Sequence, residues 1–413
     1  MRTKTIAILG AGLTGCSVAL ELAGRGHDVV LIDQDTRPMS RASLRNEGKI
    51  HLGTVYANEA TAATGLLQLR AALRFRGLLR RWLGEAVDGI RTSTPFDYVV
   101  AADSLVSPAA LAAFYARIEA AYREEIAADP ALDYLGQRPD RLFAIVPPDE
   151  AARYLAPGSF QAVFRTAERS IDTDDLAFRI RAAIAAAPGI RFLGGHEVCG
   201  FSGGGGRLVV EGRVGAASFA VAAEQVVNAT WERRLAIDRA FGLPAVPGVL
   251  HRLKYRVIVR LPEALRGAPS ATMVLGRYGD VVVRHDTVYL SWYPAGLRGW
   301  SADIEPPRDW DAACRGEPPP GVAADVARAT IAAIGRWMPS VAGTEPAMID
   351  AGAIVAHGHS DVDDPASGLH SRTRVGIVSL GSYHSVDPGK LTTAPLFGLE
   401  VAERVDRMLR AGS

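Results

Sequence analysis

The sequence predicts an α/β protein in which a Rossmann-like nucleotide-binding domain, built from discontinuous segments, carries an inserted α+β domain with an antiparallel sheet. Three observations predict this. Residues 5–33 have the order strand, glycine turn, helix and second strand. From His251 onward, polar and apolar residues alternate, as in half-buried antiparallel strands. Near the C-terminus a β-rich run, a glycine turn and a helix follow one another, as if the first domain were completed there.

The N-terminal segment has the spacing of a dinucleotide-binding turn. Thr5–Leu9 is a β-branched apolar run, and Gly10, Gly12 and Gly15 follow it as G-x-G-x-x-G. Gly10 permits the tight turn, Gly12 has no Cβ to block a pyrophosphate, and Gly15 lets the helix lie close to the sheet. The N-terminus of the helix offers N–H groups to the phosphates. Asp33 ends the second strand, about 20 residues on, where a carboxylate accepts hydrogen bonds from a ribose diol.

Length, charge and cysteine content limit the class of protein. The 413 residues can form two domains, and 46 Lys and Arg against 45 Asp and Glu give no reason to expect a nucleic-acid partner. Three cysteines without metal spacing fit a reducing compartment. The first strand starts within five residues of Met1, and no apolar run has the length of a membrane span. We therefore expect a cytoplasmic enzyme without an integral membrane segment.

The second informative segment follows Asp33. Hydrogen-bond donors crowd residues 40–49, and Gly48 and Gly53 then bracket Ile50-His51-Leu52. Composition alone leaves open whether His51 is a core residue or a functional one.

The pattern Asn46-x-Gly48-x-Ile50-His51-x-Gly53-x-x-Tyr56, together with the opening motif, resembles the FAD-dependent oxidoreductases of the D-amino-acid oxidase superfamily. Its nearest members are L-2-hydroxyglutarate oxidase/dehydrogenase and FAD-linked glycerol-3-phosphate dehydrogenase. The resemblance implies a discontinuous FAD-binding domain of the glutathione-reductase type. It places beside the flavin or the pyrophosphate Ser43, Arg45, Asn46, Gly48 and His51, and it gives Val198 a backbone contact with adenine. The sequence departs from the family at Glu47 and Trp231, where the family has a small residue and glycine.

The C-terminal segment matches the same family. Val375–Leu380 is expected to be a buried strand ended by Gly381, and a helix is expected from about Leu391. The run Gly389-Lys390-Leu391-Thr392-Thr393 resembles the G-K-L-T-T of the glycerol-3-phosphate enzymes. The resemblance implies that the N-terminus of this helix faces the N1–C2=O edge of the flavin. We expect cofactor contacts from Gly381, Gly389, Lys390, Leu391 and Thr392, and a substrate-side role for His384.

The resemblance also implies that the antiparallel sheet holds the substrate over the flavin. Among its cationic and aromatic residues we expect substrate contacts from Arg256, Tyr289 and Trp292, because a guanidinium binds a carboxylate bidentately. No metal is expected, since the spacing of His357, His359 and Asp361 favours solvent or structural roles. The FAD-binding domain is expected to comprise residues 1–93, 160–242 and 345–413, and the substrate domain residues 94–159 and 243–344.

The expected reaction is hydride removal from a carbon bearing an amino or hydroxyl group, in a small, carboxylate-bearing substrate. His51 or His384 is the expected base, and oxygen or another acceptor reoxidises the flavin. Three alternatives stay open: a monooxygenase or halogenase that uses NAD(P)H and oxygen, an NAD(P)-linked dehydrogenase, and a non-catalytic FAD-binding protein. The substrate, the attachment of the FAD and the oligomeric state also stay open.

Overall fold

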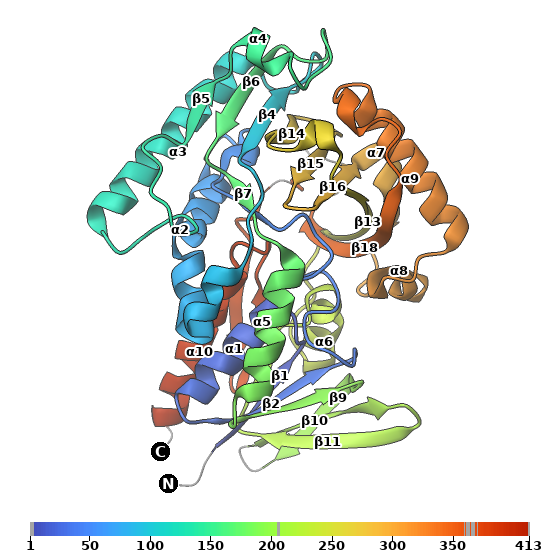
Figure 1. The fold of residues 1–413 in the computed structure, drawn as a ribbon. Coiled ribbons are helices and arrows are strands. Elements are labelled where there is room, and N and C mark those ends of the chain that lie inside the picture. Colours follow the sequence, from blue (N-terminus) through green and yellow to red (C-terminus); the bar gives the residue numbers. More distant parts are fainter. Residues whose placement is uncertain are drawn as a thin grey trace.

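The computed structural model describes residues 4–204, 207–358, 360, 364, 368–369 and 371–411. Within them, two large sheets lie one above the other, as Figure 1 shows, and the N- and C-termini lie together below the first sheet. The mixed α/β architecture confirms the predicted fold class.

The first sheet has six strands in the order β19-β20-β12-β1-β2-β8. Five of them run parallel, and β19 is antiparallel to β20. The bounds are β1 Thr5–Leu9, β2 Asp28–Asp33, β8 Ile190–Gly194, β12 Gln225–Asn228, β19 Gly376–Leu380 and β20 Tyr383–Asp387. The sheet is thus assembled from the two ends and the middle of the chain.

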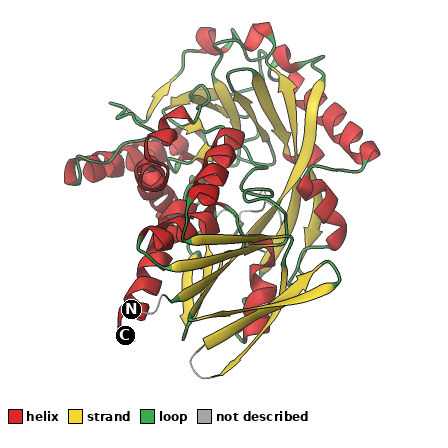
Figure 2. Ribbon diagram, turned by 60° about the horizontal axis from the view of Figure 1, so that its bottom comes forward, coloured by secondary structure: helices red, strands yellow, loops and turns green. Residues whose placement is uncertain are grey.

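Alternate residues of β1 and β2 lie in two separate hydrophobic cores, one on each face of the sheet. Ile6 and Ile8 pack with helices α1, α2, α5 and α10 on one face, whereas Ala7 and Leu9 pack with a three-stranded meander and helix α6 on the other. Figure 2 shows the meander beside the parallel strands. These helices and strands span α1 Leu13–Gly24, α2 Ala63–Leu83, α5 Thr173–Ala186, α6 Arg234–Phe241, α10 Ala394–Ala411, β9 Glu197–Gly204, β10 Arg207–Val214 and β11 Ala217–Ala223.

Two expectations about the C-terminal segment need correction. The predicted buried strand at 375–380 is β19, an edge strand whose Val378 and Leu380 are 56% and 50% exposed. The buried strand is β20, because it pairs on one side with β19 and on the other with β12. Helix α10 begins at Ala394, and Leu391–Thr393 form the turn before it.

The second sheet has nine strands, in the order β17-β13-β16-β15-β14-β4-β6-β5, with β18 paired to β13. Most neighbours are antiparallel, including the hairpin β15–β16, but β14 and β4 are parallel. The strands span β4 Phe96–Val100, β5 Phe143–Ile145, β6 Ala162–Thr166, β13 Val249–Arg260, β14 Ser270–Val274, β15 Gly279–Val283, β16 Thr287–Trp292, β17 Leu297–Ser301 and β18 Pro346–His357. Strands β6 and β18 therefore join the second sheet, although the expected domain limits put both segments in the FAD-binding domain.

Helices cover both faces of the second sheet. Helix α3 (Pro108–Ala128) packs on one face, and α9 (Pro320–Gly335) and α8 (Asp311–Arg315) pack on the other. The short helices α4 (Pro148–Ala151) and α7 (Tyr293–Gly296) complete this part of the chain. A two-stranded ladder of β3 (Lys49–Ile50) and β7 (Arg169–Ser170) lies between the two sheets and brings residues 51 and 168 together.

Candidate functional site

A long cavity runs between the two sheets. At one end it is lined by the glycine turn after β1 and by the end of β2, and at the other by β13, β14, β15 and the turn before α10. The carboxyl ends of the parallel strands β1, β2 and β12 open into it, which is where α/β sheets bind ligands.

The glycine turn has a separate steric reason for each glycine. Gly10 has φ +89°, and a Cβ there would lie 2.6 Å from the carbonyl oxygen of Ala229. A Cβ on Gly15 would lie 1.8 Å from the carbonyl oxygen of Gly10. Gly12 lines the cavity, and a Cβ there would meet only the Ser43 hydroxyl, at 3.0 Å. The turn therefore keeps a backbone cradle open at the N-terminus of α1, as a pyrophosphate requires.

Asp33 lines the end of the cavity that lies at the glycine turn. Its carboxylate accepts hydrogen bonds from the N–H groups of Ala11 (2.5 Å) and Asp35 (2.8 Å). Burial raises the pKa of Asp33 to about 6, although these two hydrogen bonds lower it. Each carboxylate oxygen can still accept a further hydrogen bond, so a ribose diol would compensate part of the cost of burying this charge.

Most residues expected at the cofactor line this cavity: Gly10, Gly12, Asp33, Ser43, Arg45, Asn46, His51, Val198, Gly389, Lys390 and Leu391. Gly15, Gly48 and Thr392 lie behind the lining, and the Thr392 hydroxyl accepts the N–H of His51 at 2.9 Å. Gly381 lies in the exposed turn between β19 and β20, away from the cavity, which corrects its expected role.

Trp231 lines the cavity in place of the family glycine. Its φ is +53°, in the left-handed region that favours glycine. Its indole N–H donates to the carbonyl oxygen of Ala353 at 2.9 Å, which ties this loop to β18. The backbone at Trp231 thus has a glycine-like conformation although the side chain is large.

The far end of the cavity is rich in positive charge. Besides Arg256, which is paired with Asp350, five cationic side chains line it, against the two carboxylates of Glu47 and Asp280; the cations are Lys49, Arg252, Lys254, Arg372 and Lys390. The Asp280 carboxylate accepts from Lys49 Nζ at 2.8 Å and lies 3.9 Å from Lys254 Nζ. Lys49 also donates to Thr272 and stands 4.1 Å from the centre of the Phe96 ring.

The charges of this cluster shift the pKa values of its members. Burial and the neighbouring Arg372 lower the pKa of Lys390 to about 7. Burial by itself raises the pKa of Glu47, but Lys254 and the other lysines bring it below its ordinary value. Among the described residues the cluster has more positive than negative charge, so an anionic group is favoured at this end.

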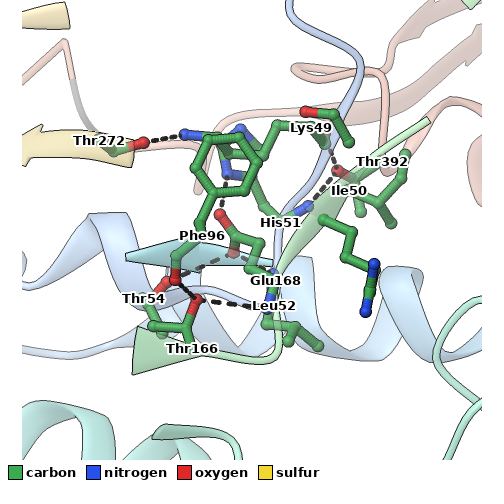
Figure 3. A network of polar contacts seen from close by, with 12 residues as sticks. Lys49, Ile50, His51, Leu52, Thr54, Phe96, Thr166, Glu168, Thr272 and Thr392 are labelled. Atoms are coloured by element: carbon green, nitrogen blue, oxygen red, sulfur yellow. Dashed lines mark hydrogen bonds and ion pairs between the residues drawn. The ribbon is translucent and has the colours of Figure 1, made fainter. Parts of the chain in front are cut away.

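His51 lines the cavity above a buried carboxylate, as Figure 3 shows. Its Nδ1 lies 3.5 Å from Glu168 Oε1, and Glu168 is fully buried. Burial lowers the pKa of His51, and Glu168 only partly offsets this. The imidazole is therefore neutral near pH 7, which is the state that a general base requires.

The structure does not bring three expected residues to the reacting end. The imidazole of His384 is buried in the first sheet between Gln225 Oε1 and Ser379 Oγ, both at 2.8 Å, and does not line the cavity. The guanidinium of Arg256 lines the cavity but makes two hydrogen bonds with Asp350, at 2.5 and 3.0 Å, and others with backbone carbonyls. Trp292 lies outside the cavity with its ring against Tyr278, whereas Tyr289 lines it.

Several cavity or supporting residues were not expected from the sequence. Glu168, Thr272 and Asp280 had no motif around them, and only the β3–β7 ladder and the order of the second sheet place them near residues 49–51. His359 and Asp361 lie outside the described residues. Among the described residues no group of three or more His, Cys, Asp or Glu could hold a metal ion, and no helix there has the length and hydropathy needed to cross a membrane.

Comparisons with known proteins agree with this fold. The family model described as FAD dependent oxidoreductase (DAO) matches residues 5–404. Similar solved structures include glycine oxidase from Geobacillus kaustophilus (TM-score 0.67, 18% identity, covering 98% of this chain and 95% of that one). L-α-glycerophosphate oxidase from Mycoplasma pneumoniae has a TM-score of 0.61 at 15% identity, with 98% and 95% covered.

A curated sequence relative is similar over a short segment only. A tRNA 5-methylaminomethyl-2-thiouridine biosynthesis bifunctional protein from Burkholderia orbicola is 42% identical over 79 residues. This segment is 19% of the chain and 12% of that protein. The two solved structures cover nearly the whole chain at low identity, so they support the fold.

Proposed function

Because the chain belongs to the FAD dependent oxidoreductase (DAO) family, it is an FAD-dependent enzyme. We propose that it oxidises a small anionic substrate at a carbon bearing an amino or hydroxyl group. This agrees with the resemblance found in the sequence. The observation that carries the proposal is the excess of positive charge at the cavity end opposite the glycine turn, beside the neutral His51.

The residues present fit the cofactor. The cradle of Gly10 and Gly12 with the N-terminus of α1 would hold the pyrophosphate, and Asp33 the ribose. Residues 43–46 and Gly389–Leu391 also line the cavity, and they would hold the flavin. When bound, FAD supplies the two-electron acceptor for the hydride that leaves the substrate carbon.

The chain's own side chains bind the substrate and move a proton. Lys254, Arg252 and Arg372 would hold the anionic group, and Tyr289 and Tyr293 form the neighbouring wall. His51 would take the proton from the substrate amine or hydroxyl while the adjacent carbon loses a hydride, so that an imine or a carbonyl compound is left.

The direct test is an anaerobic absorption spectrum of the purified holoenzyme with amino acids, amines and hydroxy acids added in turn. We expect the flavin absorption to bleach with an anionic amine or hydroxy acid and not with its neutral ester or amide. Bleaching by NAD(P)H alone would replace the proposal by a monooxygenase, and no bleaching by any of these compounds would favour a non-catalytic FAD-binding protein. Admitting air after bleaching then tests oxygen as the acceptor.

Lys254→Met tests the binding of the anionic group. Loss of one partly buried ion contact costs roughly 1–3 kcal/mol, so the substrate concentration for half-maximal reduction is expected to rise about 10-fold or more. Arg260→Met is the matched control, because Arg260 is an exposed residue at the end of the same strand. Equal effects of the two variants, or an unchanged half-maximal concentration in Lys254→Met, would contradict the assignment.

A further inference from the structure

We propose that Glu168 is a positioning residue that holds His51 in the tautomer with its proton on Nδ1, so that Nε2 is unprotonated at the cavity. This inference rests on the proposed role of His51 as the base. It gives a function to a buried carboxylate that no sequence motif marks.

The β3–β7 ladder places the two side chains opposite each other. Ile50 pairs with Arg169, so His51, the next residue after β3, lies across from Glu168, the residue just before β7. The hydroxyl of Tyr134 donates to the carbonyl oxygen of Ile50 at 2.7 Å, and the N–H of His51 donates to Thr392. The backbone around His51 is therefore held from three segments of the chain.

The hydrogen bonds of Glu168 orient its carboxylate. Oε2 accepts the N–H of Leu52 at 2.6 Å and the hydroxyl of Thr54 at 3.3 Å. Oε1 accepts the hydroxyl of Tyr98 and faces His51 Nδ1 at 3.5 Å, the outer limit of a hydrogen bond (Figure 3). Because an ionised carboxylate only accepts hydrogen bonds, the nitrogen that faces it must be the one that carries the proton.

The remaining surroundings give Nδ1 no competing partner among the described residues. Nδ1 is buried and makes no hydrogen bond of good geometry, and the Glu168 carboxylate, 3.5 Å away, is the polar group that it faces. The ring of Tyr56 meets His51 edge to face, with centroids 5.7 Å apart. The imidazole therefore offers its other edge, with Nε2, to the cavity that His51 lines.

The charges around the pair keep Glu168 ionised and His51 neutral. Burial raises the pKa of Glu168, but His51 and Lys49 bring it below its ordinary value. Burial, Lys390 and Lys49 lower the pKa of His51, and Glu168 opposes them. Four phenols that interact with Glu168 have pKa values raised, chiefly by burial, so they stay neutral; they are Tyr56, Tyr98, Tyr115 and Tyr134.

Glu168→Gln keeps a side chain of the same size but replaces the acceptor that faces His51 Nδ1 by a hydrogen-bond donor. The N–H of Leu52 cannot change its direction, so the carbonyl oxygen of the new amide must take the Oε2 position. The NH2 group then takes the Oε1 position and donates to Nδ1, which moves the imidazole proton to Nε2. The carboxylate that orients a catalytic histidine in serine proteases behaves in this way when it is changed to the amide.

The experiment measures the tautomer directly by 15N NMR on holoenzyme labelled in the histidine rings, with the His51 signals assigned by their absence in His51→Gln. We expect protonated Nδ1 in the wild type and protonated Nε2 in Glu168→Gln. Tyr98→Phe is the matched control, because it removes the phenol from the same oxygen and keeps the carboxylate, and its tautomer should equal that of the wild type.

The same variants separate the inference from the proposed function. In Glu168→Gln we expect the limiting rate of anaerobic reduction to fall about 100-fold or more, with FAD content and half-maximal substrate concentration unchanged. Protonated Nε2 in the wild type, or an unchanged tautomer in Glu168→Gln, would overturn the inference; the first result does not depend on the folding of Glu168→Gln. If the tautomer switches in Glu168→Gln but His51→Gln keeps full activity, the positioning by Glu168 is upheld and His51 is refuted as the base.

Discussion

Replacing His51 by glutamine is expected to lower the limiting rate of anaerobic FAD reduction about 10²–10⁴-fold, the usual contribution of a positioned general base. The imidazole lines the cavity in a neutral state, and glutamine has a similar reach without a basic nitrogen. The FAD content should stay unchanged, because the backbone N–H of residue 51, not its ring, contacts Thr392. Stopped-flow absorbance with a saturating substrate measures the rate.

The pH dependence of this rate gives a second criterion. The pKa of His51 is lowered, so the base is present above that pKa and the rate falls as the pH drops through it. This acid limb should disappear in His51→Gln. His285→Gln is the matched control, since His285 lies in the exposed turn between β15 and β16 and should keep both the rate and the pH profile. A wild-type rate in His51→Gln would refute the role of His51.

Gly12→Ala is expected to weaken FAD binding about 100-fold, or roughly 2.7 kcal/mol, while the apoprotein stays folded. The added methyl group would meet only the Ser43 hydroxyl within the protein, but Gly12 lines the cavity, so we expect the methyl group to crowd the pyrophosphate. Fluorescence titration of the apoprotein with FAD measures the affinity, and the thermal unfolding temperature of the apoprotein reports the fold.

Alanine substitutions at two other glycines of the same segment serve as controls for Gly12→Ala. Gly24→Ala at the end of α1 has no atom within 4 Å of the new Cβ and should keep both the FAD affinity and the stability. Gly15→Ala should destabilise the apoprotein itself, because its Cβ would lie 1.8 Å from a backbone oxygen. Wild-type FAD affinity in Gly12→Ala would show that the pyrophosphate does not approach this turn.

Local patterns were sufficient for the first domain and for much of its site. The glycine spacing and Asp33 predicted the turn at the carboxyl end of β1, and the structure opens both to the cavity. The alternation after His251 predicted antiparallel strands, which the second sheet contains. These features could be predicted because each depends on residues close together in the chain, through backbone conformation and side-chain period.

The misplaced expectations share a different cause. Apolar character made residues 375–380 look buried, but β19 is an edge strand, because the order of strands in a sheet depends on distant partners. Arg256 has the right chemistry for a substrate carboxylate, yet Asp350 on the paired strand β18 already binds its guanidinium. Period two identifies residues on one face of a strand and not what that face meets.

The dinucleotide turn and the strand-rich second domain could be predicted because both follow from neighbouring residues, and the resemblance to a known family made His51 a candidate. Which titratable groups share the cavity became clear from the three-dimensional arrangement of the strands. The β3–β7 ladder joins His51 to Glu168 across more than a hundred residues, and the second sheet brings Asp280 to Lys49. Such pairs arise from long-range strand pairing and burial, which also set their pKa values, and no local pattern encodes either.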